Sequence, residues 1–248
     1  MKRMKLVAAL LLMTLSVQAQ TADEILDKYF ENTGGREKWA SLKSVKMSGK
    51  VKVQGMEIPV EIVQTAEGLQ KVTINFQGKE ITQMAFDGNE GWSTNFMTQK
   101  AEKMDAEASA NMKQETSDFP DAFLNYKEKG YAVALEGKET VEGTETFKVK
   151  LTKKPVKVEG KEEENVSYYF FDTENYVPIM TRSTLKSGQM KGASVENVMS
   201  DYQDADGFMF PYSLTTKYNG QTGESIQIEK VETNGTIDAK SFAFPEGN

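Results

Sequence analysis

The side chains that most often carry out catalysis are missing from this sequence. The chain of 248 residues contains no histidine and no cysteine. Ser-His-Asp and Cys-His nucleophile systems, imidazole zinc sites and thiolate redox pairs are therefore excluded. Only carboxylate, lysine, serine, threonine or tyrosine chemistry remains.

The carboxylates themselves are spaced as in turns and solvated loops. A calcium loop needs oxygen ligands at alternating positions and a closing glutamate. The stretches DGN (87–89) and DADG (204–207) do not continue that way and are typical of turns. The acidic run 162–164 has no apolar neighbours that would raise a carboxylate pKa. We therefore expect that the protein is not an enzyme and has no cofactor or metal site. The alternative is a hydrolase that uses Tyr168, Tyr169 or scattered carboxylates, which assays with ester and glycoside substrates would test.

The first nineteen residues predict a cleavable export signal. Lys2, Arg3 and Lys5 precede an apolar run at 6–15, and the tail 17–19 fits the small-x-small rule of signal peptidase. Ten apolar residues rise about 15 Å as a helix, half of a bilayer core of roughly 30 Å, so we expect no membrane span. Without cysteine there is neither a disulfide nor an acylated N-terminal cysteine.

The expected mature chain, residues 20–248, is acidic. Of the 30 basic residues 27 remain against 37 acidic ones, so the net charge falls from −7 to −10. Nucleic-acid binding requires a basic patch, and the lysines here are dispersed among more numerous carboxylates. We expect one soluble, monomeric domain that does not bind nucleic acid.

Helical periodicity marks the start of the mature chain. Residues 21–35 place Ile25, Leu26, Tyr29 and Phe30 on one face and end at a Gly-Gly pair. A short second helix is expected at 36–42.

The period then changes to two. Residues 45–62 predict an antiparallel hairpin with one polar face, and similar runs separated by turn signals follow, about a dozen strands in all. The further predicted strands are 69–76, 80–86, 91–96, 131–135, 146–151, 166–171, 177–184, 193–202, 208–218 and 225–231.

The meander is interrupted once, between residues 100 and 130. Residues 101–116 carry a thin apolar stripe that includes Met104 and Met112, which predicts a helix. A further helix is expected from Asp118 to Gly130, with Pro120 in its first turn.

A sheet of this width must curl, and its concave face must be covered. Either it splits into a packed sandwich or a cavity remains beneath the few helices. Methionine packs adaptably and suits flexible apolar ligands, whereas Met and Phe at helical spacing are more often simple core. The residues leave both alternatives open.

Several segments resemble the outer-membrane lipoprotein carrier family, the LolA-like group, and their order and spacing carry the likeness over nearly the whole mature chain. They are ADEILDKYFENTGGREKWASLKSVKMSG, DGNEGW, YYFFDTENYVPIMTRST, YQDADGFMFPYSLTTKYNGQ and TIDAKSFAFP. The resemblance implies an unclosed antiparallel β-barrel of about eleven strands, covered by helices over a hydrophobic cavity.

The resemblance also implies a function and a site. It indicates a periplasmic carrier of lipoproteins or other acyl lipids toward the outer membrane, with a membrane-bound donor or acceptor as a further partner. An interaction module on the same fold, an envelope sensor or assembly factor, is the alternative. The expected cavity and lid residues are Phe76, Met84, Phe86, Trp92, Phe96, Met97, Met104, Met112, Phe119, Phe123 and Leu124.

One departure from the family concerns the latch of the lid. Its best-known members hold the lid with an arginine on an inner strand near the residues that here read AEGLQKV, at 66–72. After the predicted cleavage only Arg36 and Arg182 remain, and neither falls there. Lid control is therefore expected to differ.

Overall fold

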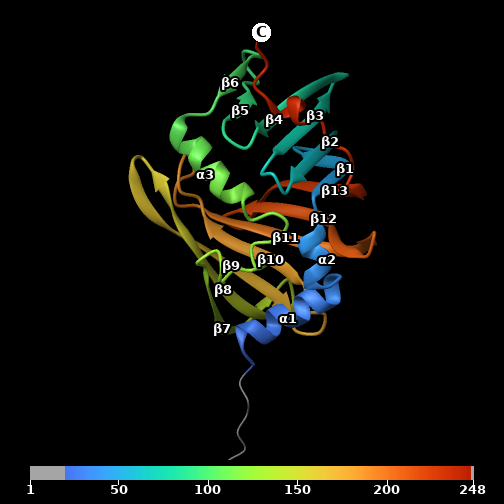
Figure 1. Cartoon of the computed structure of the whole chain (residues 1–248), viewed down its shortest axis with the longest axis vertical. Coiled ribbons are helices and arrows are strands. Elements are labelled where there is room, and N and C mark those ends of the chain that lie inside the picture. The colour runs from blue at the N-terminus through green and yellow to red at the C-terminus, as the bar shows by residue number, and fades with distance from the viewer. Residues whose placement is uncertain (1–19, 247–248) are drawn as a thin grey trace, which may run out of the picture.

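In the part of the chain that the structure describes, one antiparallel sheet of 13 strands has three α-helices on one side of it (Figure 1). The structure is a computed structural model that describes residues 20–246, so the predicted export signal at 1–19 lies outside the described residues. The helices are α1 (Ala22–Thr33), α2 (Arg36–Ser41) and α3 (Ala106–Thr116), with a 3₁₀ turn, η1 (Ala239–Phe242). The strands are β1 (Ser44–Val53), β2 (Met56–Thr65), β3 (Gln70–Phe76), β4 (Lys79–Phe86), β5 (Gly91–Thr94), β6 (Ala101–Lys103), β7 (Ala132–Val141), β8 (Thr144–Val158), β9 (Lys161–Asp172), β10 (Pro178–Thr184), β11 (Ser194–Ala205), β12 (Phe208–Tyr218) and β13 (Gln221–Thr233).

The strand order explains why the sheet is not closed. It runs β6-β5-β4-β3-β2-β1-β13-β12-β11-β10-β9-β8-β7, so every neighbouring pair except β1 and β13 is also consecutive in sequence. Strands β6 and β7 therefore remain as two free edges. The predicted unclosed antiparallel barrel under helices is confirmed, with thirteen strands instead of about eleven.

The first helix follows from its capping residues. The Thr21 hydroxyl accepts the N–H of Glu24, and the Glu24 carboxylate accepts the N–H of Thr21, which together form a capping box. The helix ends at Gly34, whose φ of 125° favours glycine. Between these ends Ile25, Leu26 and other apolar residues face the sheet and are buried.

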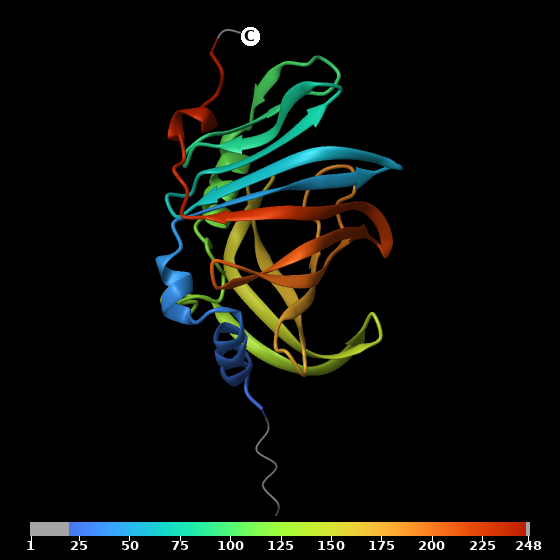
Figure 2. The ribbon, with the colours of Figure 1, turned by 90° about the vertical axis from the view of Figure 1, so that its right-hand side faces the viewer.

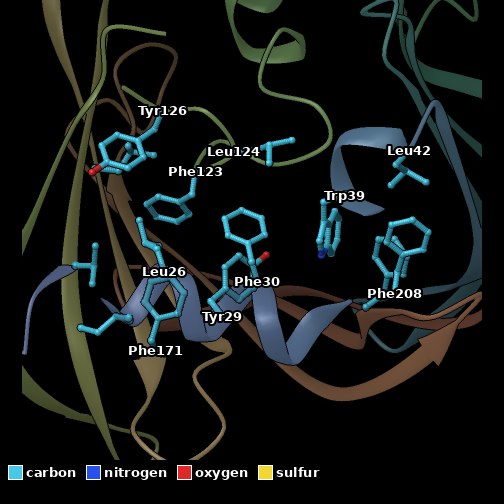
Figure 3. Packing of buried hydrophobic residues seen from close by; sticks show 14 of the residues in the cluster. Leu26, Tyr29, Phe30, Trp39, Leu42, Phe123, Leu124, Tyr126, Phe171 and Phe208 are labelled. Carbon is cyan, nitrogen blue, oxygen red and sulfur yellow. The ribbon is translucent and has the colours of Figure 1, made fainter. Parts of the chain in front are cut away.

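Helices α1 and α2 and the segment 117–131 pack on the same face of the sheet, which we call the helix-covered face. Its main core joins α1 and α2 to strands from the middle of the strand order to its β7 end, with residues that include Val45 of β1 and Val149 of β8. Figure 3 shows the aromatic character of this core. The labelled side chains are Leu26, Tyr29, Phe30, Trp39, Leu42, Phe123, Leu124, Tyr126, Phe171 and Phe208.

The insertion differs from the prediction at its start. Residues Ala101–Lys103 pair with β5 as β6, and α3 begins only at Ala106. Two contacts explain this, because the Met104 N–H donates to the Gly91 carbonyl and the Asp105 carboxylate caps the N–H of Ala108. The predicted helix start at residue 101 is wrong.

The predicted helix from Asp118 to Gly130 is also wrong, because this segment forms successive turns. The Asp121 carboxylate accepts the N–H of Phe123, a local bond that competes with helical hydrogen bonding. Asn125 has a φ of 54°, in the left-handed region, which ends any right-handed turn.

Candidate functional site

Helix α3 spans the gap between the two arms of the unclosed sheet. On one side, the hydroxyl of Ser109 accepts the N–H of Gly91 at the start of β5. On the other side, α3 reaches β8 beyond Thr152, where β7 no longer pairs with β8. Figure 1 shows α3 between β5 and the β8–β9 hairpin.

Side chains of α3 serve as hydrogen-bond partners for this free edge of β8. The Asn111 amide donates to the Lys157 carbonyl at 2.7 Å and accepts the Lys157 N–H at 3.1 Å. Gln114 donates to the Lys154 carbonyl at 2.7 Å. The Glu107 carboxylate accepts the N–H groups of residues 159 and 160 at 2.8 and 2.7 Å. The edge that would otherwise be open to another strand is thus occupied by a helix.

A pocket of about 310 Å³ lies beside the C-terminal end of α3, and we call it the amide pocket. Its walls come from three parts of the chain: the β2–β3 hairpin, the end of α3 with the segment that follows it, and the strand pair β8–β9. The lining residues are Gln64, Thr65, Leu69, Gln70, Glu115, Thr116, Asp118, Phe119, Pro120, Asp121, Ala122, Lys153 and Tyr169.

A shielded ion pair lies in the wall of the amide pocket. Asp118 accepts Lys153 at 2.8 Å and the Tyr131 hydroxyl at 2.8 Å, and Lys129 lies 3.6 Å away. The ion pair is well shielded, since the Lys153 and Asp118 side chains are 14% and 12% exposed. Burial and the bond to Asp118 raise the pKa of Tyr131 to about 12.

Asp121 lies deeper in the same wall. Its carboxylate accepts the hydroxyl of Tyr29 at 2.7 Å as well as the Phe123 N–H. Burial raises the pKa of Asp121, and these two bonds oppose the shift. Burial also raises the pKa of Tyr169, so its hydroxyl stays protonated and able to donate.

Beside the amide pocket, a row of partly buried apolar side chains crosses four strands. Met47 pairs with Ile62, Ile62 with Val72, and Val72 with Met84. Directly opposed residues in an antiparallel sheet share one face. Because Met47 packs on the main core, this face is the helix-covered one. We call these four residues the apolar row.

The next pairs along the strands extend the apolar row away from the helices. Val51, Ile58, Val60, Ile74 and Ile81 form a second cluster and are 4–8% exposed. In Figure 2 the β1–β2 hairpin carries this end of the sheet away from α1 and α2. The cluster is aliphatic, in contrast to the aromatic core beneath α1.

Three of the predicted site residues lie on this part of the helix-covered face. Met84 belongs to the apolar row, Phe76 packs against the aliphatic cluster, and Phe86 pairs with Gln70 of the amide pocket. Phe86 is fully buried.

The predicted residues of the insertion divide between the pocket and the core. Phe119 lines the amide pocket, while Phe123 and Leu124 are buried in the main core. Met104 packs against Gly91, where an added Cβ would meet its Sδ at 2.5 Å. Met112 is partly buried on α3.

Trp92 lies on the opposite face of the sheet. It pairs with Ala85, and its indole N–H donates to the carbonyl of Phe242 at 2.8 Å. Its ring packs edge-on against Phe244. Trp92 therefore holds the C-terminal segment and is not brought together with the amide pocket.

Phe96 and Met97 are separated from the pocket as well. They sit in the turn between β5 and β6, with exposures of 53% and 95%. The turn is closed by the Asn95 side chain, which accepts the N–H groups of Met97 and Thr98.

The polar residues of the pocket were missed by the sequence prediction. Gln64 continues the alternation of Ile58, Val60 and Ile62 onto the same face, so its direction was available from the period of two. For Lys153 and Tyr169 the sequence held no such signal, since β8 and β9 meet β2 and β3 only through the curl of the sheet.

Neither described arginine holds α3. Arg36 pairs with Asp27 at 2.8 Å, and Arg182 pairs with Glu196 and Glu139 at 2.8 and 3.0 Å. Contacts from amide and carboxylate side chains join α3 to β8 instead. Within residues 20–246, no cluster of three or more acidic side chains is placed to hold a metal ion.

The fold matches proteins of known structure although the sequence does not match known families. No protein-family profile and no curated protein sequence matches the chain. A LolA superfamily protein from Nitrosomonas europaea superimposes with a TM-score of 0.53 at 14% identity, over 91% of this chain and 98% of that one. A putative outer membrane lipoprotein-sorting protein domain from Vibrio parahaemolyticus gives 0.51 at 8% identity, over 88% and 94%.

The chain thus has the LolA-like fold, an unclosed antiparallel half-barrel covered by helices, as the sequence resemblance predicts. Within the described residues, no helix combines the length and apolarity needed to cross a bilayer.

Proposed function

We propose that the protein is a periplasmic carrier that binds the acyl chains of lipoproteins or other lipids along the apolar row, beneath α3. The observation that carries the proposal is the combination of this row with an adjacent pocket under the segment that follows α3. The predicted export signal and the fold shared with a lipoprotein-sorting domain support it. Binding and release require no catalytic residue.

Apolar contact provides the affinity in this proposal. Burying a chain of about fourteen methylene groups would contribute on the order of 11 kcal/mol before the cost of ordering it. The row is continuous with the aliphatic cluster beyond it, because Ile62 and Val72 pack against that cluster.

The hydrogen-bonded attachment of α3 supports the second requirement of a carrier, which is release. Only Ser109 and Thr116 are buried on α3, so few apolar contacts hold it down. Net hydrogen-bond contributions of about 0.5–1.5 kcal/mol each make its detachment from β8 feasible. The cargo would enter and leave when α3 lifts.

Organic extraction and native mass spectrometry of the freshly purified protein test the proposal, together with titration of a fluorescent fatty acid. We expect co-purified acyl species and saturable, displaceable binding. Val72→Glu should abolish binding, because it places a charge in the apolar row.

The matched control is Asn75→Glu, which adds the same charge to an exposed position on the opposite face of the same strand. It should leave binding intact. A clean protein that binds no amphiphile contradicts the proposal, and a protein partner recovered without lipid would favour an interaction module.

A further inference from the structure

The site is amphipathic along the direction of β2 and β3. Gln64 pairs with Gln70 in the amide pocket, and the next pair on the same face is Ile62 with Val72. Residues two apart on a strand are separated by roughly 7 Å. A polar end and an apolar floor therefore meet within one ligand's length, which suits a molecule with a head and a tail.

The amides of Gln64 and Gln70 are available to such a head group. Both residues are partly buried and line the pocket. In the part of the chain that the structure describes, every buried side-chain nitrogen or oxygen has a hydrogen-bond partner. These amides reach the pocket space with both donor and acceptor capacity, as does the hydroxyl of Tyr169.

Carboxylates outnumber cations around the same space, because Glu115, Asp118 and Asp121 line it together with one lysine. Lys153 is paired with Asp118, and Lys129 lies near Asp118 while donating to the Asp121 carbonyl. A carboxylate or phosphate would find no uncommitted cation in the wall. An anionic head group would also meet the carboxylates of Glu115 and Asp121, and it would lose hydration without gaining a counter-charge.

We infer that the amide pocket receives an uncharged head group bearing hydroxyl or amide groups, such as a glyceryl ester, while the acyl chain lies along the apolar row. This inference rests on the proposed lipid binding and adds the chemistry of the head. Gln64, Gln70 and Tyr169 act as the specificity-determining residues. An anionic head of equal chain length binds more weakly.

Two amphiphiles with the same acyl chain test this: a monoacylglycerol and the free fatty acid. Each displaces a fluorescent acyl probe at pH 7.5, below its critical micelle concentration. The monoacylglycerol should bind at least about tenfold more tightly than the fatty acid, equivalent to about 1.4 kcal/mol. Equal affinities would overturn the inference and leave the proposed function standing, and no binding of any amphiphile would overturn both.

The double variant Gln64→Leu/Gln70→Leu tests whether the amides of the pocket cause the preference for the monoacylglycerol. It should lose the preference for the monoacylglycerol while its affinity for the fatty acid stays the same or rises. Gln227→Leu, an equal change at an exposed position of β13, serves as the control and should retain the preference. Unchanged discrimination in the double variant would overturn the inference even if the protein binds lipid.

Discussion

Helices α1 and α3 cover the same sheet in different ways. α1 buries Ile25, Leu26, Tyr29 and Phe30 in an aromatic core, as Figure 3 shows. α3 buries only Ser109 and Thr116 and is fixed by hydrogen bonds from its side chains to the edge of β8. Packing fills the space beneath α1, whereas the space beside α3 holds a pocket and a partly buried apolar row. We therefore place the proposed lipid binding in the second region.

The largest expected effect is a difference between the two helices in how far a substitution lowers the free energy of unfolding. Phe30→Ala should lower the free energy of unfolding by about 3–5 kcal/mol, because a fully buried ring leaves a cavity. Met112→Ala, on α3, should lower it by less than about 1.5 kcal/mol. Urea denaturation followed by circular dichroism measures both. Equal losses would mean that α3 is packed as firmly as α1.

Trp92 tests whether the opposite face takes part in binding. Trp92→Ala removes the bond to Phe242 and the contact with Phe244, so stability should fall by about 2–4 kcal/mol. Affinity for a fluorescent acyl probe should stay unchanged below the melting temperature. A clear loss of affinity in the folded variant would place Trp92 in the binding site.

Asn111→Ala tests the attachment of α3 to β8. Two hydrogen bonds to Lys157 are lost, so local opening should become easier by about 1–2 kcal/mol with little change in global stability. Hydrogen exchange of the Lys157 amide should accelerate, while that of Val149, within the β7–β8 pairing, should not. An unaltered rate at Lys157 would show that α3 does not protect this edge.

The smallest expected effect is on the pH dependence of stability, to which two aspartates should contribute in opposite directions. Burial raises the pKa of the Asp121 carboxyl in the folded protein, so the folded protein binds a proton there more readily than the unfolded chain does. The folded state therefore gains stability as the pH falls through the folded-state pKa of Asp121. The bonds from Lys127 and Tyr126 lower the pKa of Asp23, whose contribution is present above the unfolded value of 3.8 and lost as pH falls.

Comparing Asp121→Asn and Asp23→Asn with the unsubstituted protein between pH 6 and pH 3 measures these contributions. The stability of the unsubstituted protein relative to Asp121→Asn should rise on acidification. Relative to Asp23→Asn it should fall. The same sign for both would refute the different environments assigned to the two carboxylates.

Local patterns in the sequence were sufficient for most of the fold but not for the site. Alternation identified the strands, and the apolar spacing of Ile25, Leu26 and Phe30 identified α1. The turns after Asp118 were missed because side-chain bonds such as Asp121 to Phe123 decide the backbone there. The face of Trp92 depends on the pairing of β4 with β5, and the pocket depends on distant strands meeting, so neither follows from spacing.

Photocrosslinking with a fatty acid that carries a diazirine near its methyl end tests the central claim most directly. After illumination, digestion and mass spectrometry should locate the label on β2, β3 and β4, at Ile62, Val72 or Met84, or on α3 beside them. Excess monoacylglycerol should suppress it. Labelling confined to the C-terminal segment near Trp92, or no specific labelling at all, would contradict the account.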